Sequence, residues 1–388
     1  MFSERTNWKL TRNRLTLALE KVRSSGVRVL DLTISNPTRA GLRYDEPLIL
    51  QSLASPRAMD YDPQPKGLPS ARASVAEYYQ TAHGISLDPE HLILTTSTSE
   101  GYSFVLRLLC DPGDELLVPK PSYPLFEFLA DLQDVKLVPY PLIYDHGWQM
   151  DFPSLEKVAT KRTRCVVVVH PNNPTGSYVH SHERESLNRF CREHEVALIA
   201  DEVFLDYSHD QAARQSLVAN HNVLTFTLSG VSKISALPQM KVAWIASSGP
   251  AAEVEAAQAR LEVIADTYLS MNAPVQWALP ALLQQRESIQ KQLLDRVLTN
   301  LVELDRQLGG QKTCQRLSVE GGWYAVLRVP VTQTDEELAV DLLCRKSVLV
   351  HPGHFYDFSS DGYLVLSLIT PRDKFAEGVE RLLEVIGR

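Results

Sequence analysis

Short, wholly apolar segments alternate with longer helical patterns between residues 92 and 247, and this alternation constrains the fold more than any other feature of the chain. The predicted strands are rich in valine, leucine and isoleucine and span residues 92–95, 115–118, 136–140, 165–169, 197–200, 223–228 and 242–246. Apolar runs of this kind are typical of parallel strands that are buried on both faces by the helices connecting them. We therefore predict an α/β fold with a mostly parallel, seven-stranded sheet between helices.

The pattern changes after Pro250. Helical stretches come first, and strand-like runs, a further helix and a closing helix follow them as far as residue 388. This mixture predicts a smaller α+β domain, to which an N-terminal helix near residues 10–24 is added. We therefore expect a large domain at 45–275 and a small domain formed by 1–44 together with 276–388.

Charge and composition exclude several classes of protein. The 388 residues include 39 Lys and Arg against 47 Asp and Glu, so the net charge of -8 provides no positive field for nucleic acid. No apolar stretch approaches the roughly 18 residues of a membrane span, and the charged N-terminal residues do not resemble a signal peptide. The five cysteines are scattered singly, without the spacing of a metal, redox or disulfide site. We expect a cytoplasmic protein with no metal and with neither nucleic acid nor a membrane as its partner.

Polar residues follow three successive predicted strands, at the edge where open α/β sheets bind ligands. The loop HPNNPTG, with Asn173, follows the fourth strand; Asp201 follows the fifth; and SGVSK, with Lys233, follows the sixth. Taken singly, Asn173 is also a common turn residue, Asp201 a common helix cap and Lys233 an ordinary surface charge. Together they predict a site in which an amide, a carboxylate and an amine converge.

In order and spacing, these residues resemble the pyridoxal-phosphate-dependent aminotransferases of class I/II, fold type I, and the resemblance extends from about residue 30 to residue 369. It implies that Lys233 binds the aldehyde of pyridoxal 5'-phosphate covalently and later carries a proton. It also implies that Asp201 keeps the pyridine nitrogen of the cofactor protonated, and that Asn173 donates a hydrogen bond to the phenolic oxygen.

The resemblance assigns five further residues to the cofactor. Thr98 and Ser99, in TTSTSEGY, match the segment that holds the phosphate at a helix N-terminus, and Lys241 stands where relatives have an arginine for the phosphate. Tyr123, in PSYPLFE, matches the aromatic residue stacked on the ring. Tyr61, in YDPQPKG, resembles a tyrosine that reaches the phosphate of a neighbouring subunit, which implies a homodimer with shared active sites.

The chain departs from the family pattern in three ways, and Lys241 in place of an arginine belongs with Gly230 to the second of them. Phe204 stands where relatives have a tyrosine that donates to the phenolic oxygen, and Gly230 where many have a serine for the phosphate. Val365, in GYLVLS, stands where relatives have an arginine that clamps the substrate carboxylate. The nearby cations by sequence are Arg39, Arg43 and Arg372. The segment before Val365 resembles the specificity loop of the family, and its two histidines, His351 and His354, do not make a metal site without further ligands.

The resemblance predicts an aminotransferase of amino acid metabolism that moves an amino group between an amino acid and a 2-oxo acid. A lyase or a decarboxylase on the same fold remains the alternative, because all three reactions begin from the same cofactor-bound substrate and use the same three residues. A non-catalytic protein that kept the fold for binding is a third possibility. The sequence names neither the amino donor nor the acceptor.

Overall fold

The computed structural model describes residues 1–209 and 215–387. Its strands are β1 Leu30–Asp31, β2 Leu92–Thr95, β3 Glu115–Lys120, β4 Lys136–Tyr144, β5 Trp148–Met150, β6 Thr163–Val169, β7 Ala197–Asp201, β8 Thr225–Gly230, β9 Ala243–Ser248, β10 Gln315–Arg316, β11 Tyr324–Arg328, β12 Val348–Leu349, β13 His351–Pro352 and β14 Tyr363–Ser367. Its α-helices are α1 Arg14–Ser24, α2 Glu46–Leu53, α3 Pro69–His83, α4 Thr98–Leu109, α5 Leu125–Leu132, α6 Phe152–Val158, α7 Ser181–His194, α8 Val231–Ile234, α9 Ala251–Tyr268, α10 Ala273–Gln284, α11 Arg286–Leu308, α12 Asp335–Lys346 and α13 Arg372–Ile386.

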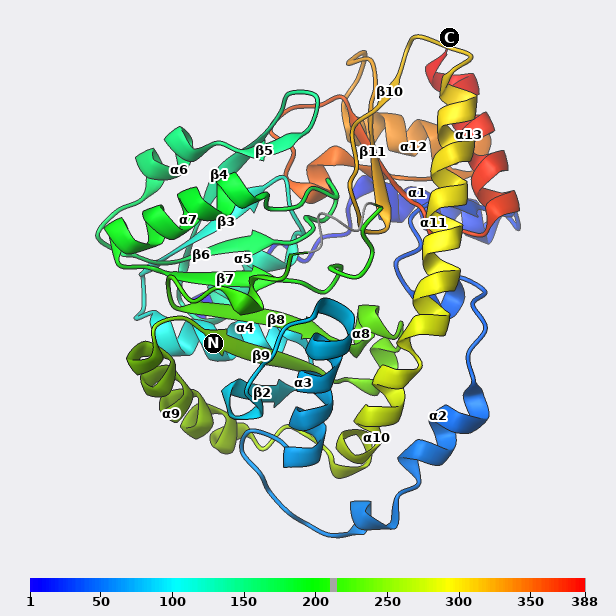
Figure 1. Ribbon diagram of the computed structural model, residues 1–388. Helices are drawn as coiled ribbons and strands as arrows, with labels where there is room; N and C mark the ends of the chain where they lie inside the picture. The colour runs from blue at the N-terminus through cyan, green and yellow to red at the C-terminus, as the bar shows by residue number, and fades with distance from the viewer. Residues whose placement is uncertain (210–214, 388) are drawn as a thin grey trace.

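The large sheet has eight strands in the order β2-β9-β8-β7-β6-β3-β4-β5 (Figure 1). Strands β3, β4, β6, β7 and β8 pair in parallel, whereas β9 runs antiparallel to both of its neighbours. Strand β2 therefore points the same way as β8, and its carboxyl end lies at the same edge. The prediction of a mostly parallel sheet between helices is confirmed, and all seven expected strands belong to it. The eighth, β5, extends the sheet through an antiparallel pairing with β4.

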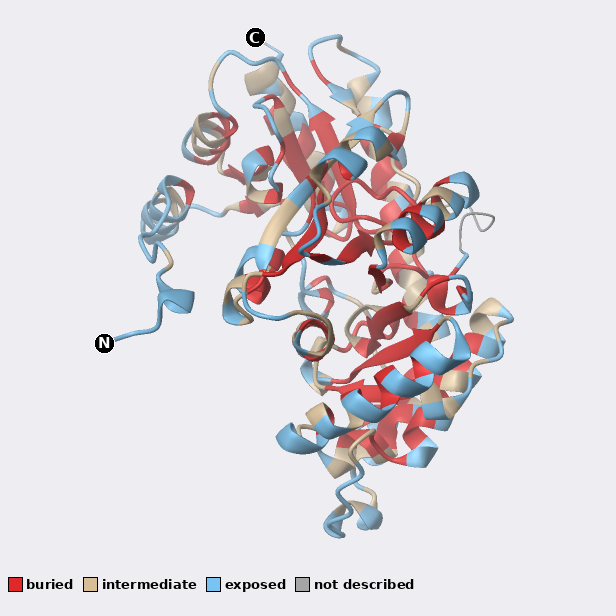
Figure 2. Ribbon diagram, turned by 90° about the vertical axis from the view of Figure 1, so that its left-hand side faces the viewer, coloured by how far each residue is buried: buried red, intermediate tan, exposed pale blue. Residues whose placement is uncertain are grey.

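Side chains alternate between the two faces of this sheet, so each face has its own core. On one face, Val167 and Ile199 pack with residues of α4, α5 and α9. On the other, Val166 and Leu198 pack with α7, and Trp244 of β9 packs with residues of α3 and α10. Figure 2 shows the result: buried strands lie between helices whose outer surfaces are exposed. This double cover leaves the ends of the strands as the places where polar groups can meet a ligand.

A second core lies around a four-stranded sheet with the order β10-β11-β14-β13. Helices α1, α11, α12 and α13 contribute to this core, and β1 of the N-terminal region pairs with β12. Figure 1 shows these elements together, with α11 in yellow beside α13 in red. The division into 45–275 and 1–44 with 276–388 stays a prediction, but a core that joins Leu15 and Leu32 to Phe375 supports it.

Helix α11 is 23 residues long and connects the two regions of the molecule. It is amphipathic, with Leu293, Val297 and Leu304 buried on one side and charged residues on the other. Across residues 1–209 and 215–387, neither α11 nor any other helix combines the length and the apolar composition that a membrane crossing needs.

Candidate active site

The carboxyl ends of five strands that point the same way supply one cavity of about 270 Å³. The residues that follow β2, β3, β6, β7 and β8 and line this cavity include Thr98, Ser99, Tyr123, Asn173, Asp201 and Lys233. Six of the eight residues predicted for the site therefore share one cavity, as expected for the edge of a parallel sheet. Their chemical roles depend on the surroundings of each side chain.

Lys233 lies in the short helix α8, directly after β8. Its ammonium nitrogen lies 5.4 Å from the ring centre of Phe204 and 4.9 Å from that of Trp323. Burial lowers the pKa of Lys233 from its usual 10.5 to about 8, while the charge of Asp201 opposes this shift. An amine with this pKa is partly neutral near pH 8, so Lys233 can act as a nucleophile and as a proton carrier.

Asp201 is the last residue of β7. Its carboxylate accepts hydrogen bonds from the Tyr102 hydroxyl (3.1 Å) and from the Val203 amide (3.2 Å). Burial raises the pKa of Asp201 from its usual 3.8 to about 6, against the opposite effects of these two hydrogen bonds and of Lys233. A positive group of a ligand would relieve the cost of burying this charge, so the carboxylate is suited to a cationic ring nitrogen.

Asn173 lies in the loop after β6 and is buried. Its side-chain Oδ1 atom has no hydrogen-bond partner in the described structure. Buried polar groups are rarely left unpaired, and the two ends of an amide are hard to tell apart from geometry alone. This orphaned group is consistent with a ligand that carries an oxygen or a hydroxyl opposite Asn173.

The N-terminus of α4 supplies the anion-binding end of the cavity. Thr98 and Ser99 are its first two residues, and the preceding Ser97 caps the helix by accepting a hydrogen bond from the Glu100 amide (3.2 Å). Glu100 in turn accepts a hydrogen bond from the Thr96 amide (2.7 Å). The free amides of such a helix start and the helix dipole both favour a phosphate, and two hydroxyls beside them add donors.

The second region of the molecule closes the cavity from the other side. Ser35, Tyr324, His351 and Tyr356 all line it, although they come from parts of the chain far from the strand ends of the large sheet. The Ser122 amide, just before Tyr123, donates a hydrogen bond to the Tyr356 carbonyl (2.9 Å) and so joins the two regions at the site. The cavity therefore depends on how the two regions are packed together.

Two of the eight predicted residues do not line this cavity. Lys241 is exposed, with a positive φ of 54° at the end of the turn after α8. Tyr61 is 82% exposed and lines a different cavity of about 480 Å³, together with Arg57, Asp60 and Trp277. Within one chain, neither side chain joins Lys233.

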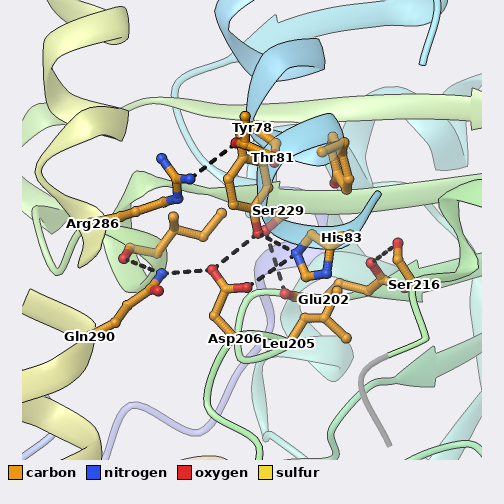
Figure 3. A network of polar contacts seen from close by, with 12 residues as sticks. Tyr78, Thr81, His83, Glu202, Leu205, Asp206, Ser216, Ser229, Arg286 and Gln290 are labelled. Carbon is orange, nitrogen blue, oxygen red and sulfur yellow. Dashed lines mark hydrogen bonds and ion pairs between the residues drawn. The ribbon is translucent and has the colours of Figure 1, made fainter. Parts of the chain in front are cut away.

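A buried polar network joins Asp206, His83 and Gln290 (Figure 3). Further hydrogen bonds fix the backbone at Lys233 and Ile234. The Tyr207 hydroxyl donates a hydrogen bond to the Lys233 carbonyl (2.6 Å), and the Gln290 amide of α11 donates to the Ile234 carbonyl (2.9 Å). Gln290 also donates to Asp206 (2.7 Å), which is paired with His83 at 3.1 Å. Both members of this pair are 1% exposed. Helices α3, α8 and α11 are thereby linked at the base of the site.

Glu202, next to Asp201, faces away from the cavity and belongs to the same network. Its carboxylate accepts hydrogen bonds from the Ser216 hydroxyl and from the Leu217 amide, each at 2.6 Å. Burial raises the pKa of Glu202 to about 8. The two adjacent acids therefore have separate functions, because Asp201 lines the cavity whereas Glu202 ties the loop at 216–217 to the end of β7.

The structure gives a physical reason for one of the three departures. A Cβ atom at Gly230 would lie 2.7 Å from the Val242 carbonyl oxygen and 2.9 Å from Ala243 Cα, because β8 and β9 pair closely at this point. A serine therefore does not fit at Gly230 without moving β9. Phe204 is buried against Trp323 with ring centres 5.1 Å apart, and its side chain lines the cavity without a polar group.

Several lining residues escaped the sequence analysis. Tyr102, which holds Asp201, lies four residues after Thr98 on the same face of α4, so helical periodicity offered a signal. Ser232 stands directly before Lys233 and lines the cavity with it. Ser35 and Tyr324 had no such signal, because their approach depends on the packing of one region against the other.

The arrangement suits a flat ligand with a cationic nitrogen toward Asp201, an oxygen toward Asn173, an anion toward α4 and an electrophilic carbon within reach of Lys233. Within residues 1–209 and 215–387, no group of three or more His, Cys, Asp or Glu side chains comes together as a metal site would require. The chemistry of the cavity is therefore that of an amine and a buried acid acting on an organic group.

Comparison with known proteins gives a family match across most of the chain. A family model described as aminotransferase class I and II matches residues 43–382. The alanine aminotransferase of Mycobacterium tuberculosis is 29% identical over 373 residues, which cover 93% of this chain and 86% of that protein. A glutamate-pyruvate aminotransferase of Haemophilus influenzae is 26% identical over 376 residues, covering 93% and 91%.

Solved structures show the same fold. An alanine aminotransferase from Pyrococcus furiosus superposes with a TM-score of 0.91 and 22% identity, and the match covers 100% of both chains. At this identity the likeness concerns the fold alone, and the arrangement of strands and helices described above is the part that it supports.

Proposed function

The chain belongs to the aminotransferase class I and II family, and we propose that within it the protein moves the amino group of alanine, or of another amino acid with a small uncharged side chain, to a 2-oxo acid. Membership makes the protein an aminotransferase that uses pyridoxal phosphate and acts on amino acids and 2-oxo acids. The convergence of Lys233, Asp201 and Asn173 on one cavity supports the cofactor chemistry, and the small volume of that cavity, about 270 Å³, is the observation that carries the choice of substrate.

Six residues would hold the cofactor. Thr98 and Ser99 would bind its phosphate at the start of α4, and Tyr123 would cover the ring. Asp201 would pair with the ring nitrogen, and the side-chain Nδ2–H group of Asn173 would donate a hydrogen bond to the phenolic oxygen. Lys233 would form the covalent bond to the aldehyde carbon of the cofactor. Once bound, pyridoxal phosphate supplies an electron-withdrawing ring and a carbon that accepts the amino group.

Proton transfer falls to Lys233. Its amine is the basic group of the cavity, and burial keeps its pKa near 8, so the nitrogen can both take and return a proton at neutral to mildly basic pH. Asp201 keeps a negative charge opposite the ring nitrogen, and the Tyr102 hydroxyl holds that carboxylate in place. Tyr123, Phe204 and Tyr324 supply the aromatic part of the cavity wall beside these groups.

The size and the lining of the cavity support a small substrate. At about 270 Å³ it is smaller than the roughly 300–1,000 Å³ of sites for drug-sized ligands, and it must hold both cofactor and substrate. Its described walls contain no second cation that could pair with the side-chain carboxylate of a dicarboxylic donor. The relative from Mycobacterium, whose name refers to alanine, points in the same direction. The name of the relative from Haemophilus refers to pyruvate, which is small, and to glutamate, which is a dicarboxylic acid.

A half-reaction tests the proposal. Purified enzyme is treated with one amino acid at a time, and the visible absorption of the cofactor is followed. Alanine should convert the cofactor to its amino form, and pyruvate should restore it, whereas aspartate and lysine should be much slower. Release of ammonia or carbon dioxide without a recoverable amino form would instead indicate the lyase or decarboxylase alternative. A Lys233→Ala variant should lose the reaction, and its full activity would overturn the assigned role.

We also propose a homodimer in which Tyr61 completes the site of the other subunit. Tyr61 is 82% exposed and lies outside the cavity of Lys233, so its predicted role at the phosphate requires a second chain. Met59, two residues before it, is 88% exposed, and a partner chain would cover both side chains. Lys241, at the end of the turn that follows α8, would approach the phosphate from its own chain.

We place the enzyme in the cytoplasm. Its five cysteines are unpaired, in keeping with a reducing compartment, and its proposed substrates are metabolites of that compartment. Fractionation of cells that produce a tagged full-length chain would test this location.

A further inference from the structure

His351 lies at a distinctive point of the small sheet. It pairs directly with Val365 across β13 and β14, and directly paired residues of antiparallel strands point to the same face of the sheet. Tyr324, on β11, pairs with Ser367, two residues along β14 from Val365, and therefore shares this face. Because both His351 and Tyr324 line the active-site cavity, a long side chain at Val365 would point toward it as well. Valine is too short and too apolar to bind an anion there.

The contacts of His351 leave one nitrogen free for a ligand. Its Nδ1 atom lies 3.0 Å from the Tyr356 hydroxyl, and its Nε2 atom has no hydrogen-bond partner among the described residues. Burial lowers the pKa of His351 to about 4, although Asp31 opposes the shift, so the free imidazole is neutral at pH 7. Burial also keeps the Tyr356 hydroxyl protonated, since it raises its pKa well above the usual value. In the tautomer in which the Tyr356 hydroxyl donates to Nδ1, the proton of the ring is on Nε2.

An amino acid or a 2-oxo acid brings a carboxylate into this cavity, and a buried carboxylate needs donors. Among the described lining residues there is no arginine, and the one lysine is Lys233. Arg372 is paired with Asp295 (2.7 Å) on the surface, and neither Arg39 nor Arg43 lines the cavity. Among the lining side chains from the small region, His351 alone offers a nitrogen donor.

We propose that the Nε2–H group of His351 binds the substrate carboxylate and so selects for carboxylate-bearing amines, with Tyr356 as the positioning residue that fixes the imidazole tautomer. The assignment rests on the proposed function, because it takes an amino acid as the substrate. A bound carboxylate would itself favour protonation of the ring and strengthen the contact.

The test compares two ligand pairs in holoenzyme variants. Alanine and alaninamide have the same amine but differ in the carboxylate, and propionate and propionamide make the same comparison without any reaction. The variants are His351→Ala, which removes the donor; His351→Gln, whose amide restores an N–H group; and His354→Ala, an exposed histidine three residues away in the same loop, as the matched control. The visible band of bound cofactor, unchanged in all three, would show that the site is folded.

We expect His351→Ala to weaken propionate binding and to lower kcat/KM for alanine by roughly 10- to 100-fold, the usual effect of losing a hydrogen bond to a charged group. Binding of propionamide and turnover of alaninamide should change little, His351→Gln should recover part of the loss, and His354→Ala should match the wild type. Equal losses for acid and amide, or none for either, would overturn the assignment. If the wild type bound propionate but no amino acid reacted, the substrate proposal would fail while the propionate series still tested His351.

Discussion

At the scale of single residues, burial decides the chemistry of this site more than the presence of charged neighbours. The pKa of Lys233 moves down and that of Asp201 moves up, and in both cases burial is the largest cause while their mutual attraction opposes it. Burial therefore makes the charged forms of both groups costly in the absence of a ligand. A ligand with a positive ring nitrogen and an electrophilic carbon would lower this cost, because the nitrogen pairs with Asp201 and the carbon bonds to the neutral amine of Lys233. The cost of burying these two charged side chains therefore favours cofactor binding to the cofactor-free protein.

The pKa of Lys233 predicts the pH dependence of cofactor uptake. Only the neutral amine attacks an aldehyde, and the neutral fraction rises as the pH passes through about 8. Cofactor-free enzyme should therefore take up pyridoxal phosphate faster as the pH rises from 6.5 to 9.5, with a midpoint near 8, which stopped-flow absorbance would measure. A rate that is flat between pH 7 and 9 would contradict the lowered pKa.

The same shift affects stability with a definite sign. The folded pKa of about 8 lies below the usual 10.5, so between these values the unfolded chain binds more protons at Lys233 than the folded one. The contribution of Lys233 to the free energy of unfolding of the cofactor-free protein should therefore rise with pH from about 8 to 10.5. Urea titrations of the wild type and of Lys233→Met at pH 8 and 10 would measure it, and the difference between the two proteins should shrink at the higher pH.

Because Phe204 stands where relatives have a tyrosine, we expect the bound cofactor to have a higher pKa than a tyrosine at this position would give. A Phe204→Tyr variant adds a hydroxyl to a side chain that lines the cavity, and a donor to the cofactor's phenolic oxygen favours its charged form. The pKa seen in the visible band of bound cofactor should fall by roughly 1 unit. Phe204→Leu, which changes packing but adds no donor, is the control. Identical pKa values in the wild type and in Phe204→Tyr would contradict a hydrogen bond from position 204 to the phenolic oxygen.

At the scale of elements, the strands of the large sheet were predictable and some of their partners were not. Buried parallel strands read as continuous apolar runs, and all seven runs became strands. Strand β5 escaped because only three residues, Trp148–Met150, form it, after a turn at His146 and Gly147. Lys233, Asp201 and Asn173 could be found because they follow strands, whereas Tyr324 could not, since only the packing of the small sheet brings it to the site.

The network between α3, α8 and α11 predicts a large effect of one buried acid. Asp206 accepts hydrogen bonds from Tyr78 (3.1 Å) and Gln290 (2.7 Å) and pairs with His83. Asp206→Ala leaves these donors without their buried partner, so the free energy of unfolding should fall by about 3–5 kcal/mol. Urea titration followed by tryptophan fluorescence would measure it.

The matched control removes an acid of the same kind from the surface. Asp295 is 68% exposed in its pair with Arg372, so Asp295→Ala should cost no more than about 1 kcal/mol. Because Gln290 also binds the carbonyl next to Lys233, activity should fall in Asp206→Ala at temperatures where the protein is still folded. If Asp206→Ala lowered the free energy of unfolding no more than Asp295→Ala does, the network would not stabilise the base of the site.

At the scale of the whole molecule, the residues of the site come from three places: the strand ends of the large sheet, the small region and, as proposed, a second subunit. The first two meet within one chain around Lys233. Tyr61 lies outside this cavity and is exposed. Its proposed role in a second subunit can be tested without a structure of the dimer. If two chains share their sites, two inactive variants should together make one active site.

Mixed dimers of Lys233→Ala and Tyr61→Ala, purified through two different tags, make this test. If Tyr61 serves the opposite subunit, the mixed dimer has one site with both changes and one with neither, so it should show about half the wild-type activity. If Tyr61 serves its own chain, every site carries one change, and the mixed dimer should be no more active than the Tyr61→Ala dimer. Each variant alone is expected to retain at most a weak activity, so recovery in the mixed dimer would come from a site built by both chains. Sedimentation of the wild type as a monomer would contradict the shared site directly.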